Sequence, residues 1–514
     1  MEMTLGQAFA RSARKYPHKT AVMDDESDMS YDLLNRRVNR WSHALGGMGL
    51  GKGRKVATLS NNCIRLMEVF LGNLKSGVVT VPLNSRGTLD ELAFQIRKTD
   101  TEMLVFERSY TKTVEALYNM LPDLKRYICL GDNANTGTFA MNYDDLLDQS
   151  SESEPEISLV EEDDAVIMFT GGTTGIPKGA ILTHKNLLWN IICTTTENRT
   201  PAPEEKTLYP MQIYHIAAYS RFLGFMYAGG TFIAIKDFDA DKILDTVERE
   251  RVTFMVGNPT IYRMLLDANR KRRRDTSSMI RWICTQGFLH QNLKEELEKD
   301  LWPPGGLYGS YALTESSPAV TVLKPWDMPR EDGSVGRPYM CIEVRIVDDQ
   351  DQDVPVGMEG EIIVNGPTVF KGYYKDPEET EKTLRNGWLH TGDVGKYDDL
   401  GYLYMVDRLK DMIKTGGLNV YCREVEEVLS YHPGIAEGVV IGLPDEKWGE
   451  AVCAVVVPKK GEQLSAESVI AHCRERLASY KKPASVIFVD ELPKGTFGGK
   501  VLKRVLRDTY SNLK

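Results

Sequence analysis

The stretch "TGGTTGIPKG", residues 170–179, follows an apolar run, "AVIMF", and places three glycines and three threonines ahead of one lysine. Glycines let backbone amides converge on an anion, and threonine hydroxyls add further donors. In the common nucleotide loop, G-x-x-x-x-G-K-[ST], the lysine follows the second glycine directly, whereas two residues separate Gly175 from Lys178 here. Because Thr183 is a suitable helix N-cap, we expect the stretch where a strand ends and a helix begins. The composition indicates an anion-binding turn of another kind, or a structural glycine-rich turn.

The chain around this stretch alternates short apolar runs with amphipathic segments. Helical spacing of apolar residues is clear over 64–77 and 239–252. The runs expected to form strands are 55–60, 78–83, 103–107, 165–170, 231–236, 252–257 and 281–287. This repetition predicts an α/β fold with largely parallel sheets covered by helices. After Gly333 the pattern changes to that of an antiparallel β region, and the C-terminal segment predicts a small α+β domain.

The length of 514 residues exceeds what one hydrophobic core accommodates, so several structural units are expected. From Arg408 onward the chain has 17 Lys and Arg against 14 Asp and Glu, whereas the whole chain has a net charge of −10. A strand-like run followed by a charged segment and a Gly-Gly turn is typical of a boundary. We therefore predict domains at 1–407 and 408–514, and an exposed acidic connector at 149–164.

Composition excludes several classes of protein. The acidic balance argues against general nucleic-acid binding, which needs a basic face. The N-terminus lacks the apolar core of a secretory signal, and the most apolar stretch, 213–235, is interrupted by charged and glycine residues. The eight cysteines have no metal-ligand spacing, so we expect reduced, mostly buried thiols. A cytoplasmic protein is the expectation.

At this point "TGGTTGIPKG" can be compared with known signatures: it resembles the phosphate loop of the adenylate-forming superfamily, which includes acyl-CoA synthetases, luciferases and peptide-synthetase adenylation domains. Further stretches resemble that family's motifs, in the family's order, across nearly the whole chain. They are "LKSGVVTVPLN" (74–84), "YPMQIYHIAAY" (209–219), "YGSYALTESSP" (308–318), "GWLHTGDVG" (387–395), "DRLKDMIKTGGLNVYCREVE" (407–426) and "LPKGTFGGKVLKR" (492–504).

The resemblance implies a fold and a reaction. The fold would be a large N-terminal body of two mainly parallel αβ sheets with a β-barrel-like subdomain, followed by a small mobile α+β domain. The reaction would have two halves: a carboxylate attacks ATP to give acyl-AMP and pyrophosphate, and a thiol then displaces AMP. The implied ligands are ATP, Mg²⁺ and CoA, with no prosthetic group.

The resemblance also implies an ATP site and its catalytic residues. Glu315 would hold Mg²⁺ together with Thr170, and Thr314 would contact the α-phosphate. Tyr311 would stack on adenine. Lys500 would deliver its ammonium group to the charge that develops at the α-phosphate. The remaining residues implied for ATP or AMP are Gly171, Gly172, Thr173, Thr174, Gly175, Lys178, Ser310, Asp393 and Arg408. Each residue type also has an ordinary structural role, such as a core tyrosine or a surface lysine.

The C-terminal part carries the residues implied for the thiol step. Lys410 stands at the family's hinge position, where backbone torsion turns the small domain and withdraws Lys500. Gly416 and Gly417 would border the pantetheine arm of CoA, because absent side chains permit close approach. The net positive charge after Arg408 fits a partner with several phosphates.

The acyl end is implied to lie at 209–219. Its pocket would include Tyr214, His215, Ala218 and Phe288, with His215 near the reacting carboxylate. Between positions 212 and 230 there is no Asp or Glu, which disfavours an amino-acid substrate because nothing would pair its ammonium. Two departures from the family pattern, Phe288 and Ala312, leave the acid undefined.

We therefore predict an AMP-forming acyl-CoA synthetase whose substrate is a small-molecule carboxylic acid. Medium- or long-chain fatty acids are the first candidates, and aryl or alicyclic acids are the second. The alternatives are a ligase that loads a carrier protein and a non-enzymatic nucleotide-binding protein. A monomer or homodimer is expected. The basic run of residues 270–274 is interpreted as a solvated helix end, with weak contact to an anionic membrane, centred on Arg273, as the alternative.

Overall fold

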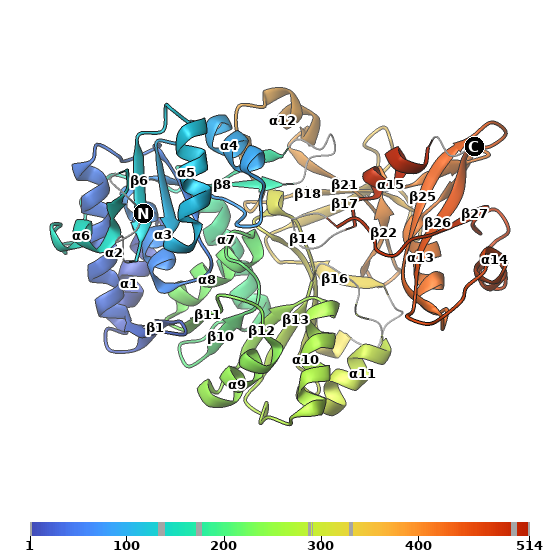
Figure 1. Cartoon of the computed structure of the whole chain (residues 1–514), viewed down its shortest axis with the longest axis horizontal. Helices are drawn as coiled ribbons and strands as arrows, with labels where there is room; N and C mark the ends of the chain where they lie inside the picture. The colour runs from blue at the N-terminus through green and yellow to red at the C-terminus, as the bar shows by residue number, and fades with distance from the viewer. Residues whose placement is uncertain are drawn as a thin grey trace. The chain divides into compact units, whose positions relative to one another are not determined.

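The structure is a computed structural model that describes residues 3–131, 139–170, 177–285, 289, 291–327, 333–494 and 501–511 (Figure 1). The chain divides into two compact units. Unit 1 is Met1–Val344 with Val364–Leu389, and unit 2 is Arg345–Ile363 with His390–Lys514. Residues 390–407 thus pack with the C-terminal segment. The sequence-based boundary at 407 marks where the mobile domain is expected to begin, and that boundary stays a prediction.

The first sheet of unit 1 contains the glycine-rich stretch. Its strand order is β19-β9-β8-β4-β3-β5-β6-β7. The pairs β3/β4, β3/β5, β5/β6 and β4/β8 are parallel. The bounds are β3 (Lys55–Leu59), β4 (Val79–Pro82), β5 (Met103–Glu107), β6 (Arg126–Leu130), β7 (Met141–Asn142), β8 (Asp164–Thr170), β9 (Lys178–Thr183) and β19 (Gly372–Tyr373).

The second sheet of unit 1 is parallel at its centre and antiparallel toward β16. Within unit 1 the strand order is β16-β15-β14-β13-β12-β10-β11-β1-β2. The bounds are β1 (Thr20–Met23), β2 (Asp28–Ser30), β10 (Lys206–Tyr209), β11 (Thr231–Ala234), β12 (Phe254–Gly257), β13 (Arg281–Cys284), β14 (Leu307–Ala312), β15 (Ala319–Leu323) and β16 (Ser334–Pro338). All seven expected strands are confirmed, because each is a short apolar run buried in a sheet.

Helices cover these sheets because each has one apolar side. Figure 1 shows α9, α10 and α11 grouped beside β10–β13, and their buried residues form one core with those strands. The bounds are α1 (Leu5–Lys15), α2 (Tyr31–Gly47), α3 (Ile64–Ser76), α4 (Leu89–Lys98), α5 (Thr111–Met120), α6 (Tyr143–Asp148), α7 (His184–Asn198), α8 (Ile216–Ala228), α9 (Ala240–Glu250), α10 (Pro259–Lys271), α11 (Gln291–Asp300) and α12 (Pro377–Thr383). The expected helices at 64–77 and 239–252 are α3 and α9.

The glycine-rich stretch does not run directly from a strand into a helix, which corrects one expectation. β9 returns antiparallel to β8, with Thr170 opposite Lys178, and α7 begins only after β9. Thr183 is the N-cap of α7 as predicted, with a capping box to Asn186. The positive end of the α7 dipole is therefore separated from the loop by a six-residue strand, roughly 20 Å of extended chain.

Unit 2 contains the antiparallel region and the small α+β part. β21 pairs antiparallel with β22, and β25 forms a long antiparallel pair with β26. The bounds are β17 (Glu343–Val347), β18 (Gly360–Asn365), β21 (Trp388–Tyr397), β22 (Leu403–Arg408), β23 (Ile413–Thr415), β24 (Leu418–Val420), α13 (Cys422–Ser430), β25 (Ile435–Asp445), β26 (Gly449–Pro458), α14 (Ala466–Arg474), β27 (Ser485–Phe488) and α15 (Lys503–Tyr510).

The cysteines require one correction. Cys193 and Cys341 form a disulfide, with Cα atoms 6.5 Å apart, whereas the sequence indicated eight reduced thiols. The prediction was wrong for this pair because residues separated by 148 positions are brought together only by tertiary packing. The other six cysteines are free, and five of them are buried.

The basic run of residues 270–274 is largely neutralised. Arg270 and Arg273 pair with Asp300, and Arg272 and Arg274 pair with Asp245. These ion pairs favour the interpretation of residues 270–274 as a solvated helix end over contact with an anionic membrane. Across the part of the chain that the structure describes, no helix is both long and apolar enough to cross a membrane.

Candidate nucleotide and acyl site

Each end of the glycine-rich loop contacts a carboxylate from a distant part of unit 1, Thr170 that of Glu315 and Lys178 that of Glu379. Thr170 Oγ1 donates a hydrogen bond of 3.4 Å to Glu315 Oε1. Glu315 lies in a short 3₁₀ turn, Thr314–Ser316, that follows β14, and the backbone carbonyl of Glu315 accepts from Phe370 N at 2.9 Å. The structure therefore brings together Thr170 and Glu315, the two residues implied as metal ligands, although 145 positions separate them.

Two further residues complete this cluster, and the sequence interpretation missed both. Tyr373 Oη donates a hydrogen bond of 2.9 Å to Glu315 Oε1, and Lys178 forms an ion pair with Glu379 at the start of α12. The Lys178 ammonium also lies 5.4 Å from the centre of the Tyr373 ring. The Asp-Pro pair at 376–377 predicts the start of a helix, α12, but nothing in the sequence indicates that this helix lies beside β9.

Burial keeps the hydroxyl of Tyr373 protonated, so that it can donate a hydrogen bond. Desolvation, together with the negative charge of Glu315, raises the pKa of Tyr373 well above its usual range. The hydroxyl is thus protonated at neutral pH and orients the carboxylate of Glu315. A carboxylate held in this way keeps lone pairs for a cation or for further donors.

The centre of the loop and the expected catalytic lysine lie outside the described residues. This applies to Gly171, Gly172, Thr173, Thr174, Gly175 and Lys500. The described ends still constrain the loop, because Thr170 and Lys178 are cross-strand partners.

β14 carries the residues expected beside adenine. Tyr311 is buried and lies opposite Thr321 of β15, and Ser310 Oγ donates to the carbonyl of Thr321 at 3.1 Å. Thr314 begins the turn that positions Glu315. Ser310 and Tyr311 thus lie on β14, and Thr314 and Glu315 lie in the turn that follows it.

In unit 2, Asp393 and Arg408 lie opposite each other on β21 and β22. Arg408 Nε lies 3.3 Å from Asp393 Oδ1, and the side chain of Asp393 is only 4% exposed. Asp393 N also donates to Thr391 Oγ1 at 3.1 Å. A carboxylate held beside a guanidinium offers acceptor oxygens at a fixed place, which suits hydroxyl recognition.

The expected hinge residue, Lys410, lies two positions after Arg408. Burial and the positive charge of Arg408 lower the pKa of Lys410. Arg507 of α15 donates to the carbonyl of Lys410 at 3.4 Å and pairs with Asp411 at 3.2 Å. The guanidinium of Arg507 thus ties the hinge backbone to the helix that follows the expected catalytic lysine.

The expected CoA-binding glycines form the turn between β23 and β24. Both have positive φ, +57° at Gly416 and +80° at Gly417, which favours glycine. A Cβ atom added at Gly416 would lie 2.8 Å from the Trp448 ring, whereas a Cβ atom added at Gly417 would have no neighbour within 4 Å. The indole of Trp448 is half-exposed, so the turn has an accessible aromatic neighbour.

The expected acyl segment lies at the start of α8. His215 is the N-cap residue, and its ring lies 4.5 Å from that of Tyr214. Ala218 is fully buried, whereas Phe288 lies outside the described residues. Burial, assisted by the positive charge of Arg86, lowers the pKa of His215 to about 4, so the imidazole is neutral at neutral pH.

Comparison with known proteins shows the family to which the chain belongs. The family model "AMP-binding enzyme" matches residues 9–374, and "AMP-binding enzyme C-terminal domain" matches residues 424–500. A feruloyl-CoA synthase of an Amycolatopsis species is 37% identical over 98% of this chain and 99% of its own. A long-chain fatty-acid–CoA ligase of Mycobacterium tuberculosis is 32% identical over 99% and 98%.

Among solved structures, ATP-bound MatB from Rhodopseudomonas palustris superposes with a TM-score of 0.89 at 32% identity, covering 99% of both chains. The chain belongs to the AMP-binding enzyme family. It is an adenylate-forming enzyme of the acyl-CoA synthetase type, an acid–thiol ligase with the mixed α/β fold of that superfamily.

Replacement of Glu315 tests the cluster. Glu315→Gln removes the negative charge while keeping the shape, so acid-dependent pyrophosphate release should fall about 10²-fold to 10³-fold. Tyr373→Phe removes only the hydrogen bond that orients the carboxylate, so a loss of about tenfold is expected. Steady-state pyrophosphate release at saturating ATP measures both, and a Glu315→Gln enzyme of normal rate would contradict the assigned role.

The neutral His215 predicts a pH effect on stability. The unfolded chain protonates this histidine near its usual pKa of about 6.5, before the folded state does. Its stabilising contribution is thus complete above that pH and is lost as the pH falls toward 4, by at most about 1.4 kcal/mol per pH unit. His215→Gln should show a smaller drop in melting temperature between pH 7 and pH 5 than the unaltered enzyme. Equal drops would contradict this account.

Proposed function

We propose that this enzyme activates a carboxylic acid with ATP to give an acyl-AMP and then transfers the acyl group to CoA. The observation that carries the proposal is the cluster of Thr170, Glu315 and Tyr373 at the base of the glycine-rich hairpin. It supplies one carboxylate, oriented by two hydroxyl donors, beside a loop whose glycines and threonines suit phosphate binding.

Magnesium fits this cluster as a partner of the nucleotide. Mg²⁺ is commonly bound by one or two carboxylates together with substrate phosphates, and Glu315 with Thr170 offers a carboxylate and a hydroxyl oxygen. Among the described residues no group of three or more His, Cys, Asp or Glu side chains forms a separate metal site. When bound, the ion would neutralise phosphate charge; Glu315 and Thr170 would hold it.

Lys178 would bind the phosphates that leave as pyrophosphate. Its ammonium is paired with Glu379 and lies over Tyr373, so an arriving polyphosphate would exchange with Glu379 for the same cation. Asp393 and Arg408 would bind the ribose, and Tyr311 the adenine. Lys500 would stabilise the charge that develops at the α-phosphate.

The thiol step would use a second arrangement of the small domain. Rotation at Lys410 would withdraw Lys500 and place the turn of Gly416 and Gly417 beside the pantetheine arm of CoA. The bond from Arg507 to the carbonyl of Lys410 supports this proposal, because it ties the hinge backbone to α15.

Two acid classes are supported. The buried Ala218 and the aromatic Tyr214 suit an apolar acyl chain, and a fatty-acid ligase is among the relatives. An aryl acid is the second candidate, because the relative that is 37% identical is a feruloyl-CoA synthase. A carrier-protein acceptor remains the alternative to CoA: accumulation of acyl-AMP regardless of CoA would favour it.

The two half-reactions should respond oppositely to two variants. Lys500→Ala should cripple adenylation by about 10²-fold or more while leaving thioester formation from supplied acyl-AMP largely intact. Lys410→Pro should spare adenylation and suppress the thiol step, because proline restricts hinge rotation. Pyrophosphate release measures the first half, and acyl-CoA formation from supplied acyl-AMP measures the second. Loss of the same half by both variants would overturn the two-state account.

A screen of acids tests the enzyme class and the acid together. CoA-dependent AMP release should be supported by acids with an apolar body, and not by amino acids, because α8 offers no carboxylate for an ammonium group. Fatty acids of increasing length and substituted aryl acids are the two arms. If no acid supports pyrophosphate release, the proposed reaction is wrong.

A further inference from the structure

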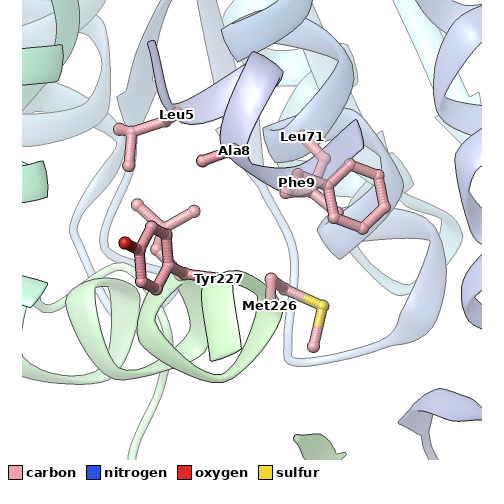
Figure 2. A pocket seen from close by; sticks show the side chains of 7 residues that line it. Leu5, Ala8, Phe9, Leu71, Met226 and Tyr227 are labelled. Carbon is pink, nitrogen blue, oxygen red and sulfur yellow. The ribbon is translucent and has the colours of Figure 1, made fainter. Parts of the chain in front are cut away.

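A small hollow between α1 and α8 is lined by apolar side chains, among them Leu5, Leu71 and Met226 (Figure 2). These side chains carry no charge, so they offer nothing that would recognise a nucleotide or a carboxylate. The ion pair of Lys178 and Glu379 differs from such a hollow. A cation that is proposed to bind phosphates is here already paired with a carboxylate of the protein itself. The pair therefore bears on how polyphosphate enters and leaves the site.

Strand β19 brings Glu379 to the side of Lys178. β19 pairs antiparallel with β9, and Tyr374 N donates a hydrogen bond of 2.8 Å to the carbonyl of Gly179, the residue after Lys178. The chain then enters α12, and Glu379 lies in the first turn of that helix. Because the two strands are paired, two side chains that are 201 positions apart in sequence meet at the base of the glycine-rich loop.

The first turn of α12 is fixed in place by its own hydrogen bonds. Asp376 is the N-cap, and its carboxylate accepts from Glu379 N at 3.3 Å. Thr380 Oγ1 accepts from Tyr373 N at 2.9 Å and donates to the carbonyl of Asp376 at 2.7 Å. These bonds hold the turn against β19. The backbone of Glu379 therefore stays beside Lys178 whether or not the two side chains are paired.

The pair is shielded from water, unlike the neighbouring acid of the same turn. The side chain of Lys178 is 11% exposed and that of Glu379 is 24% exposed, and the ammonium lies 5.4 Å from the centre of the Tyr373 ring. Glu378 is 82% exposed and pairs with Lys382, one helical turn further on, at 2.7 Å. Charges that are screened less by water attract each other more strongly. Glu379 is therefore the acid of this turn that acts on Lys178.

A carboxylate and a polyphosphate that use the same ammonium group compete with each other. Any ligand that needs Lys178 unpaired binds more weakly, by the fraction of molecules in which the lysine is free. Resting on the proposed function, we propose that Glu379 is a built-in competitor of polyphosphate for Lys178. It is a positioning residue that weakens the binding of ATP and of pyrophosphate by the same factor, and so favours release of the product.

The exchange also accounts for the state of Lys178 between turnovers. A shielded ammonium group without an anion is costly, and a ring contact compensates only part of that cost. Glu379 neutralises Lys178 when no nucleotide is bound and takes it back when pyrophosphate leaves. When polyphosphate is bound, the partly exposed carboxylate of Glu379 can turn toward water. Glu379 itself touches none of the reacting atoms in this account.

Glu379→Gln tests the proposal, because it removes the charge and keeps the shape. The dissociation constants of ATP and of pyrophosphate, each titrated with Mg²⁺ into the full-length enzyme by calorimetry, should both fall about fivefold. Pyrophosphate should also inhibit AMP release at a concentration lower by the same factor, while the KM values of the acid and of CoA stay unchanged. A merely structural role would not move the two phosphate ligands together and leave the other substrates unaffected.

Glu378→Gln is the matched control, since it removes the same charge one residue away and should leave both dissociation constants unchanged. Glu379→Asp keeps the charge and should retain part of the weakening. In a Lys178→Ala background, Glu379→Gln should change either constant less than about twofold. Unchanged constants in Glu379→Gln, or an equal change in Glu378→Gln, would overturn the role of Glu379 in an enzyme that is still active. Failure of every acid to release pyrophosphate would instead overturn the proposed reaction, because the titrations need no turnover.

Discussion

The antiparallel return of β9 onto β8 is the constraint on which the site depends. It places Thr170 and Lys178 opposite each other, so both ends of the glycine-rich loop are held at one strand edge. It also keeps the α7 N-terminus away from the loop, so the dipole that serves common nucleotide loops is not used here. Glu315 and Tyr373 then gather at the same edge through hydrogen bonds of 3.4 and 2.9 Å. The loop proposed to bind phosphates and the carboxylate proposed to bind the metal thus share one base.

The charges of the site are arranged by burial in each unit separately. In unit 1 burial keeps His215 neutral and Tyr373 protonated at neutral pH, and Lys178 is paired with Glu379. In unit 2, Arg408 pairs with Asp393 and precedes the expected hinge residue, Lys410, by two positions. Arg507 donates a hydrogen bond to the backbone carbonyl of Lys410.

Arg221 of α8 differs from these groups because its contact is with an aromatic ring: its guanidinium lies 4.6 Å from the centre of the Phe254 ring. Elsewhere in unit 1 buried basic side chains have carboxylate partners, as Arg274 has in Asp245 and Arg281 in Glu205. The sequence showed that Arg221 is the one residue of fixed charge between positions 212 and 230. Its surroundings depend on how α1, α7 and β11 pack against α8, which no local pattern contains.

The sequence by itself determined the strand and helix order, because short apolar runs and helical spacing report burial directly. It also supplied the family and the residue types of the site through motifs that are contiguous in the chain. Only the tertiary structure decided that a strand follows the loop, that Tyr373 and Glu379 join Thr170, Lys178 and Glu315, and that Cys193 meets Cys341. These are contacts between residues far apart in sequence, and their existence follows from sheet pairing and packing rather than from local preference.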